Sequence, residues 1–127
     1  MPSPRFTMVV LLIEDLPRSV AFYRLLGVAF PADVDARRDV VVDIGGGHNL
    51  VLTTTFERHD PDRRPPSGGA RTFLEFFVDG DAAVDELYGT LVDAGHASRR
   101  APFRTDFDAY MAMVDDPDGN TVLVTSG

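Results

Sequence analysis

The sequence predicts a protein of the α+β class, built from two βαβββ repeat units, one in each half of the chain. Its 127 residues suit a single domain, residues 1–127, large enough to bury a substantial core. Apolar runs rich in β-branched residues alternate with two stretches of helical spacing. The second half repeats the first, because aligning residues 8–13 with 73–78 also brings Tyr23 over Tyr88. The alternative is a generic α+β sandwich whose halves resemble each other by chance.

The first half, about residues 5–56, begins with an apolar run at 6–13 that predicts a buried strand. Asp15 is a suitable N-cap and Pro17 suits a first helical turn, so a helix is expected from there to Gly27. Three further strands are expected, and a glycine turn at 45–47 would join the last two. They cover residues 28–30, 39–44 and 50–55.

The second half, about residues 70–126, has the same order of elements. Residues 57–69 are polar and rich in Pro and Gly, which predicts an exposed linker between the halves. A strand at 72–78 and a helix at 81–94 follow. The remaining strands are expected at 97–101, 110–114 and 121–125, and the turn Asp116-Pro117-Asp118-Gly119 would join the last two.

The composition excludes several kinds of chemistry. The chain has no Cys, no Trp and no Lys, so thiol nucleophiles, thiolate metal sites, disulfides and Schiff-base lysines are excluded. A net charge of −8 argues against nucleic acid as a partner and favours cationic small molecules. No apolar run approaches the roughly 18 residues of a membrane span, and no secretion signal is evident. We therefore expect a cytoplasmic protein with no membrane partner.

Two motifs carry a family resemblance. Residues 15–23, Asp-Leu-Pro-Arg-Ser-Val-Ala-Phe-Tyr, are followed by Leu26-Gly27, and Asp116-Pro117-Asp118-Gly119-Asn120 lies near the end. Together with the repeat they resemble the vicinal oxygen chelate superfamily, which includes glyoxalases, bleomycin-resistance proteins and extradiol dioxygenases. The resemblance covers nearly the whole chain. It implies that each unit curls a mixed sheet into a half-cup with its helix outside, that the halves enclose a pocket, and that the protein is a homodimer.

The resemblance also implies where a metal would be bound. In the enzymes of this superfamily, four side chains from four strands hold a divalent ion, and these positions correspond to Met8, Val51, Phe73 and Leu123. All four are apolar, and a shift of one residue along any strand brings in no better donor than a threonine. We therefore expect no metal and no cofactor.

Alternation along the strands predicts most of the residues that line the pocket, and the resemblance implies that Met111 and Met113, on the strand before the turn at 116–119, face inward too. The lining is apolar and aromatic with a few polar points, which is typical of small-molecule sites. The alternative is that these side chains meet one another and fill the cup as core. The predicted pocket residues are Met8, Val10, Val51, Thr53, Phe73, Glu75, Phe77, Met111, Met113 and Leu123.

Glu75 is the member of this set that does not suit a core. Between Phe73 and Phe77 its carboxylate would be partly desolvated, and it is a candidate anchor for a cationic ligand or a general base. The alternatives are an ion pair with Arg5 or Arg104, or exposure at the rim of the cup. Asp39 is a weaker candidate of the same kind.

Other polar and aromatic residues give weaker signals. The three histidines, His48, His59 and His96, are expected in solvated loops and form no metal-binding motif. Arg58, Arg63 and Arg64 alternate with acidic residues, which favours a solvated linker over an anion site. Residues 103–110, which contain Phe103, Arg104, Phe107 and Tyr110, look loop-like and suggest a lid over the pocket.

Two functional hypotheses follow. The first is a metal-free binding protein that sequesters an aromatic or cationic natural product, as in antibiotic resistance. The second is a divergent lyase or dioxygenase-like enzyme, which would use Glu75 as acid or base or a non-standard metal site such as His48 with Glu75.

Overall fold

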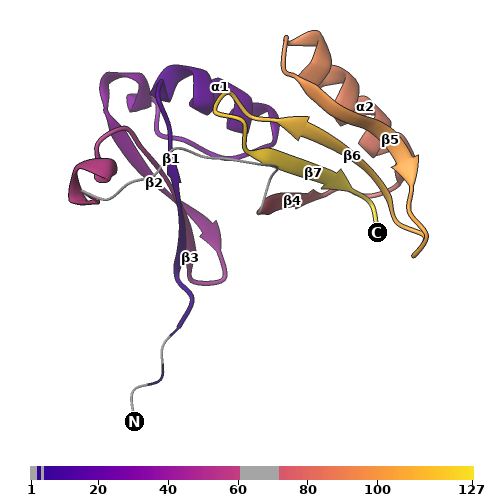
Figure 1. The fold of residues 1–127 in the computed structure, drawn as a ribbon, viewed down its shortest axis with the longest axis horizontal. Helices are drawn as coiled ribbons and strands as arrows, with labels where there is room; N and C mark the ends of the chain where they lie inside the picture. Colours follow the sequence, from indigo (N-terminus) through magenta and orange to yellow (C-terminus); the bar gives the residue numbers. More distant parts are fainter. Residues whose placement is uncertain (1–2, 4, 61–71) are drawn as a thin grey trace. The chain divides into compact units, whose positions relative to one another are not determined.

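The computed structural model describes residues 3, 5–60 and 72–127, which form two compact units, residues 1–65 and 66–127 (Figure 1). Each unit has one β-sheet and one α-helix. This is the expected α+β class with two repeat units, and the fold prediction is confirmed. No helix in the described part of the chain is long and apolar enough to cross a membrane.

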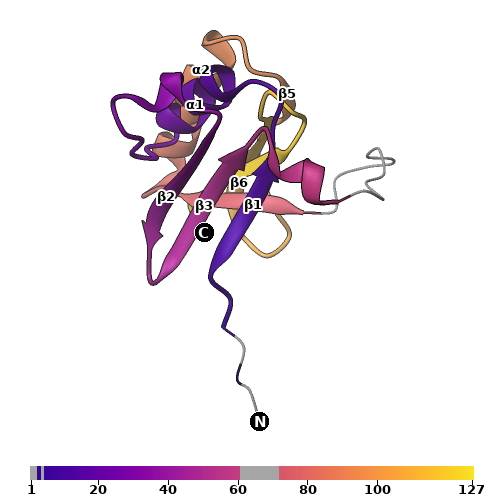
Figure 2. The ribbon, with the colours of Figure 1, turned by 90° about the vertical axis from the view of Figure 1, so that its left-hand side faces the viewer.

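The first unit has a three-stranded sheet with β3 in the centre (Figure 2). Strand β1 (Met8–Leu12) runs parallel to β3 (His48–Thr53), and β2 (Asp39–Gly45) runs antiparallel to it. Helix α1 (Leu16–Leu25) connects β1 to the rest of the unit. Two short 3₁₀ helices, η1 (Val34–Ala36) and η2 (Phe56–His59), complete it.

Helix α1 begins and ends where the local sequence requires. The Asp15 side chain accepts a hydrogen bond from the backbone N–H of Arg18 at 3.1 Å, and Pro17 stands in the first turn. The chain leaves the helix through Gly27, whose φ of +87° lies in the left-handed region. Buried Val20 and Tyr23 belong to the face with which α1 contributes to the core.

The second unit has a four-stranded sheet in the order β4-β7-β6-β5. Its strands are β4 (Phe73–Phe77), β5 (Ser98–Arg104), β6 (Tyr110–Asp115) and β7 (Thr121–Thr125). Helix α2 (Asp81–Asp93) packs across β5, β6 and β7 (Figure 1). The units therefore correspond strand for strand, except that β5 has no counterpart in the first.

The turn between β6 and β7 is organised by Asp116, which is buried. Its carboxylate accepts hydrogen bonds from the backbone N–H groups of Asp118 at 2.9 Å and Asn120 at 2.8 Å. It also accepts one from the Asn120 side-chain amide at 2.9 Å. This motif therefore has a structural role in shaping the hairpin.

Three boundary predictions need correction. Residues 28–30 form no strand, because Pro31 ends the segment without a backbone donor and a 3₁₀ turn follows. Strand β5 runs on to Arg104 and β6 begins at Tyr110, so the predicted lid is only a tight turn at 105–109. Of the predicted linker, residues 61–69 lie outside the described residues and 57–59 belong to η2.

Each sheet buries the apolar residues of one side almost completely, whereas the other side has both exposed and buried residues, with Thr53, Met111, Thr121 and Thr125 among the buried ones. In the first unit the buried positions alternate along β2 and β3, and in the second they lie on β6 and β7. The buried set comprises Val40, Val42, Leu50 and Leu52, then Ala112, Val114, Val122 and Val124. The opposite side of each sheet is the one that carries the predicted pocket residues.

Candidate functional site

The strand register of the first unit brings four predicted pocket residues onto one side of its sheet. Val10 lies opposite Val51, and Val51 lies opposite Val41 on β2. Met8 and Thr53 belong to the cross-strand pairs on either side of this one, on the same side of the sheet. Met8, Val10 and Leu12 each leave more than a third of their surface exposed, so these side chains do not bury one another as a core would.

A pocket of about 340 Å³ lies on this side of the first unit. Its floor is apolar and one end is polar, which is a common arrangement in small-molecule sites. The lining comprises the four predicted residues Met8, Val10, Val51 and Thr53, with Asp39, Val41, Thr55, Phe56, Arg58 and His59.

Asp39 is held in place by the end of strand β3. Its carboxylate accepts hydrogen bonds from the hydroxyls of Thr53 at 2.6 Å and Thr55 at 2.8 Å, and from the backbone N–H of Thr54 at 3.0 Å. These donors, the Thr53 hydroxyl first, lower the pKa of Asp39 from its ordinary value of 3.8. Asp39 is thus an anion already satisfied by protein donors, which favours a structural role over catalysis.

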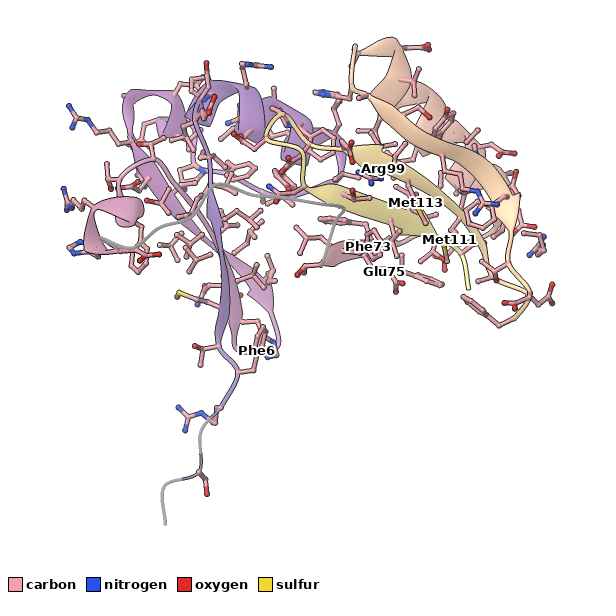
Figure 3. The ribbon with its side chains drawn as sticks, viewed as in Figure 1. Phe6, Phe73, Glu75, Arg99, Met111 and Met113 are labelled. Carbon is pink, nitrogen blue, oxygen red and sulfur yellow. The ribbon has the colours of Figure 1, made fainter. Side chains whose placement is uncertain are left out.

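The second unit repeats this arrangement on its own exposed side. Glu75 lies opposite Leu123, Leu123 opposite Met113, and Met113 opposite Arg100 on the far edge strand. The next row contains Phe77 and Met111. Figure 3 shows Phe73, Glu75, Met111 and Met113 extending from the same side of this sheet.

A second pocket, of about 510 Å³, lies against β5 and β6 of this unit. It is lined by three predicted residues, Met111, Met113 and Leu123, and by Arg100, Phe103, Arg104, Thr105, Asp106 and Phe107. Phe73, Glu75 and Phe77 are on the edge strand β4 and do not line it. The ten predicted residues therefore form three groups. Four line the first pocket, three line the second, and the three on β4 line neither.

Glu75 is exposed, so the expected desolvation of its carboxylate is wrong. The ion pair with Arg104 is also wrong, because Arg104 pairs with Asp81 of α2 and lies 3.8 Å from Asp108. Within residues 5–60 and 72–127, no hydrogen bond or ion pair engages the Glu75 side chain. Of the remaining alternative, exposure at the rim of the cup, the structure supports the exposure and places Glu75 on the edge strand β4.

Contacts between α2 and the strands account for the two other shifted pKa values. The hydroxyl of Ser126, at 2.8 Å, and the guanidinium of Arg104 lower the pKa of Asp81. Tyr110 donates a hydrogen bond to Asp85 at 2.7 Å, and this carboxylate raises the pKa of Tyr110. The contacts of Asp81 and of Tyr110 attach α2 to the sheet. Of the residues that make them, only Arg104 also lines the second pocket.

The positions of the histidines and of Arg58 differ in part from the solvated loops and linker that the sequence predicts. His48 lies in β3 rather than in the glycine turn, is half-buried, and has its ring 5.7 Å from that of Phe6. His59 accepts a hydrogen bond from Arg58 at 3.3 Å, and both line the first pocket. His96 is half-buried just after α2. Arg63 and Arg64 lie outside the described residues.

The side chains at the four positions that the resemblance implies for a metal do not form a donor set for a divalent ion. Met8, Val51, Phe73 and Leu123 offer one thioether and three hydrocarbon side chains, and divalent ions need carboxylate, imidazole or comparable donors. In the described part of the chain, no group of three His, Asp or Glu side chains is placed to hold a metal.

Sequence reasoning missed one feature, the contact between Arg100 and Phe103. The guanidinium carbon of Arg100 lies 3.4 Å from the centroid of the Phe103 ring. Residues three apart on a regular strand point to opposite sides, so the sequence carries no signal for this pair. An irregularity in the β5–β6 register brings them together, with Arg100 opposite Met113 and Phe103 opposite Met111.

Comparisons with known proteins agree with this geometry. Residues 5–124 match the family model described as Glyoxalase/Bleomycin resistance protein/Dioxygenase superfamily. No protein of curated function matches the sequence.

Several solved structures share the fold. A glyoxalase/bleomycin resistance protein/dioxygenase family enzyme from Burkholderia phytofirmans PsJN is 23% identical, with a TM-score of 0.78 over 94% of this chain and 96% of that one. A glyoxalase-related enzyme from Fulvimarina pelagi is 22% identical (TM-score 0.79; 97% and 88% covered). A lactoylglutathione lyase from Agrobacterium tumefaciens is 24% identical (TM-score 0.66; 99% and 96% covered). With the family model spanning nearly the whole chain, the protein belongs to the glyoxalase/bleomycin resistance protein/dioxygenase superfamily.

Proposed function

We propose that the protein is a metal-free binding protein of this superfamily, which sequesters a small aromatic or cationic molecule. The observation that carries the proposal is the chemistry of the four positions where the superfamily's enzymes hold their metal. A thioether and three hydrocarbon side chains stand there, and two of them, Met8 and Val51, line the first pocket. A surface of this kind favours an apolar ligand over an ion.

The lining of both pockets supports an aromatic ligand. Met8 in the first pocket, and Met111 and Met113 in the second, provide thioethers, which adapt their shape to flat rings and make favourable contacts with them. Phe56 and Phe103 add aromatic surface to the respective pockets. Both volumes lie within or near the range of sites for small organic molecules.

Glu75 and the net charge of −8 support a cationic group on the ligand. The Glu75 carboxylate is exposed between Phe73 and Phe77, which leave 47% and 62% of their surface exposed. A cation bound there would contact both a carboxylate and aromatic rings. The acidic surface as a whole would raise the local concentration of cationic molecules.

The metal-free part of the proposal is tested by elemental analysis of protein purified without chelator. We expect divalent metal well below one ion per chain, and a melting temperature that EDTA leaves unchanged, because Met8, Val51, Phe73 and Leu123 are poor metal ligands and the described residues hold no alternative cluster. One stoichiometric divalent ion per chain would contradict the proposal and the assignment of the four metal positions.

The binding part is tested by thermal shift with a panel of aromatic and cationic natural products. We expect compounds that raise the melting temperature, because a ligand that binds only the folded state stabilises it. The shifts of cationic compounds should shrink in Glu75→Gln, while Glu86→Gln, an exposed position on α2, serves as the charge-matched control. Equal shifts in both variants would contradict a role for Glu75.

We also propose that the protein forms a homodimer. Large apolar side chains outside the two pocket linings are exposed, among them Phe6, Ile44, Phe73 and Phe77. Exposed apolar surface of this kind favours association. Sedimentation equilibrium should give twice the mass of the chain, and a monomer at micromolar concentration would contradict the proposal.

A further inference from the structure

We propose that the second pocket binds ligands with an acidic group, such as a carboxylate, sulfonate or phosphonate, on an aromatic body, and that Arg100 holds this group. The inference rests on the proposed function in its aromatic form, because it names the ligand chemistry of one of the two pockets; the cationic form concerns Glu75 on β4, which does not line this pocket. It concerns a residue outside the expected pocket set, and it depends on the contacts of strand β5.

The register of β5 directs Arg100 into the pocket. Ser98 lies opposite Val114, and Arg100 lies opposite Met113, so two steps along β5 correspond to one step along β6. A second irregularity follows before Phe103, which lies opposite Met111. Bulges of this kind re-aim side chains, and here they place Arg100 and Phe103 among the lining residues.

The guanidinium of Arg100 is positioned before any ligand arrives. Its central carbon lies 3.4 Å from the centroid of the Phe103 ring, which is a stacking distance. A guanidinium stacked by its face keeps the N–H donors along its edge for an oxyanion. Stacking also restricts the long side chain, so binding an acidic group costs less conformational entropy.

The other two arginines of β5 already have carboxylate partners. Arg99 lies 3.7 Å from Asp115, and Arg104 pairs with Asp81. Within residues 5–60 and 72–127, no carboxylate pairs with Arg100. Arg100 is therefore the cation on this strand that is free to bind an external acid.

The rest of the lining fits a ligand with an apolar body. Met111, Met113 and Leu123 form the floor beside Arg100. The lining contains one carboxylate, Asp106, in the turn that follows β5. Phe103 and Arg104 separate it from Arg100 along the strand, so the preference for an acidic group belongs to the Arg100 end of the pocket.

Two fluorescent probes of matched shape test the proposal. 8-Anilino-1-naphthalenesulfonate carries a sulfonate, and N-phenyl-1-naphthylamine has the same ring system without it. In fluorescence titrations of the full chain, we expect Arg100→Gln to weaken binding of the sulfonate probe by about tenfold, as expected for loss of a charge-assisted hydrogen bond. Binding of the neutral probe should change less than about twofold, because the apolar floor is intact.

Arg99→Gln is the control, because it removes the same charge from the neighbouring residue of the same strand. We expect it to leave both affinities within about twofold, since Arg99 is committed to Asp115. Equal weakening of the sulfonate probe by both variants, or equal weakening of both probes by Arg100→Gln, would overturn the inference. If the wild-type protein bound neither probe, the proposed function itself would fail. If it bound the neutral probe while Arg100→Gln left the sulfonate probe unaffected, only the inference would fail.

Discussion

At the scale of single residues, the structure separates carboxylates that stabilise the fold from those that remain available to a ligand. Asp39 and Asp116 each accept three hydrogen bonds from neighbouring protein donors. Glu75 is exposed on an edge strand. The sequence alone makes Asp39 a weaker candidate of the same kind as Glu75, and it does not predict the threonine donors of Asp39, because hydroxyls that arrive from another strand are visible only in the folded register. Glu75 therefore remains the better candidate for contact with a ligand.

Asp39→Asn should lower the free energy of unfolding by about 1 kcal/mol at pH 7, because an amide oxygen replaces a carboxylate that accepts three hydrogen bonds at a largely exposed position. The pKa of Asp39 is lower in the folded chain than its ordinary 3.8. Its contribution to stability is therefore present above pH 4 and disappears as the pH falls through the lowered pKa. Urea unfolding at pH 7 and at pH 3 measures the difference, which should shrink at pH 3.

The control for this experiment is Asp35→Asn, an exposed position in η1 that removes the same charge. We expect it to change stability by less than about 0.5 kcal/mol at either pH. If both variants were equally stable at pH 7, the threonine contacts of Asp39 would not contribute to stability.

At the scale of elements, the two helices begin in different ways. Helix α1 has a side-chain cap at Asp15, whereas α2 follows Gly80, which has a φ of +90° and offers no side-chain cap. The first turn of α2 is instead attached to the sheet through Asp81, which contacts Ser126 and Arg104. Helix α1 therefore depends on its cap more than α2 does.

Asp15→Ala should lower the free energy of unfolding by about 1 kcal/mol, because the Arg18 N–H loses its acceptor at the first turn of α1. Asp15→Asn is the matched variant, since its side chain keeps the acceptor oxygen, and we expect it to retain most of the stability. Thermal or urea unfolding followed by circular dichroism compares the two. An equal loss in both would mean that the charge of Asp15, acting on the helix dipole, stabilises the helix instead of the hydrogen bond.

The elements also show which parts of the fold can be predicted from the sequence. The sequence predicts both helices, six of the seven strands and the two hairpin turns close to their observed bounds. The signals are local ones: apolar periodicity, Asp15, Gly27 and the glycine-rich turns. Strand β5 was predicted at its start but not in its length or its irregularities. Those depend on how β5 pairs with β6, which is a non-local interaction. Arg100, which we propose as a ligand contact and which the sequence does not suggest, lies on this strand.

At the scale of the whole chain, each unit uses the two sides of its sheet for different purposes. One side packs into the core, and the other carries apolar residues that line a pocket or remain exposed. The prediction of the ten pocket residues depends on this alternation and on the repeat, and for Met111 and Met113 on the family resemblance of the strand before the turn at 116–119. Which of the ten line a pocket does not follow from the alternation alone, since Met8 and Val10 on the edge strand β1 line one, whereas the residues of the edge strand β4 lie outside both linings.

Val41 and Val42 test this division, because they are neighbours on β2 with 57% and 5% of their surface exposed. The same deletion at each, Val→Ala, removes two methyl groups. Val42→Ala should lower the free energy of unfolding by about 2 kcal/mol, because the removed methyls leave a space in the core. Val41→Ala should change it by less than about 0.5 kcal/mol.

For ligand binding, Val41→Ala should have the larger effect of the two substitutions. Val41 lines the first pocket and Val42 does not, so a compound bound there should lose affinity in Val41→Ala and keep it in Val42→Ala. Urea unfolding without ligand measures the first effect, and titration of a panel compound that binds the first pocket serves as the probe for the second. Comparable losses of stability at both positions would mean that the outer side of this sheet is also buried in solution, as a dimer interface across this face would require. Binding and association would then compete for the same apolar surface, and the affinity for the probe would fall as protein concentration rises.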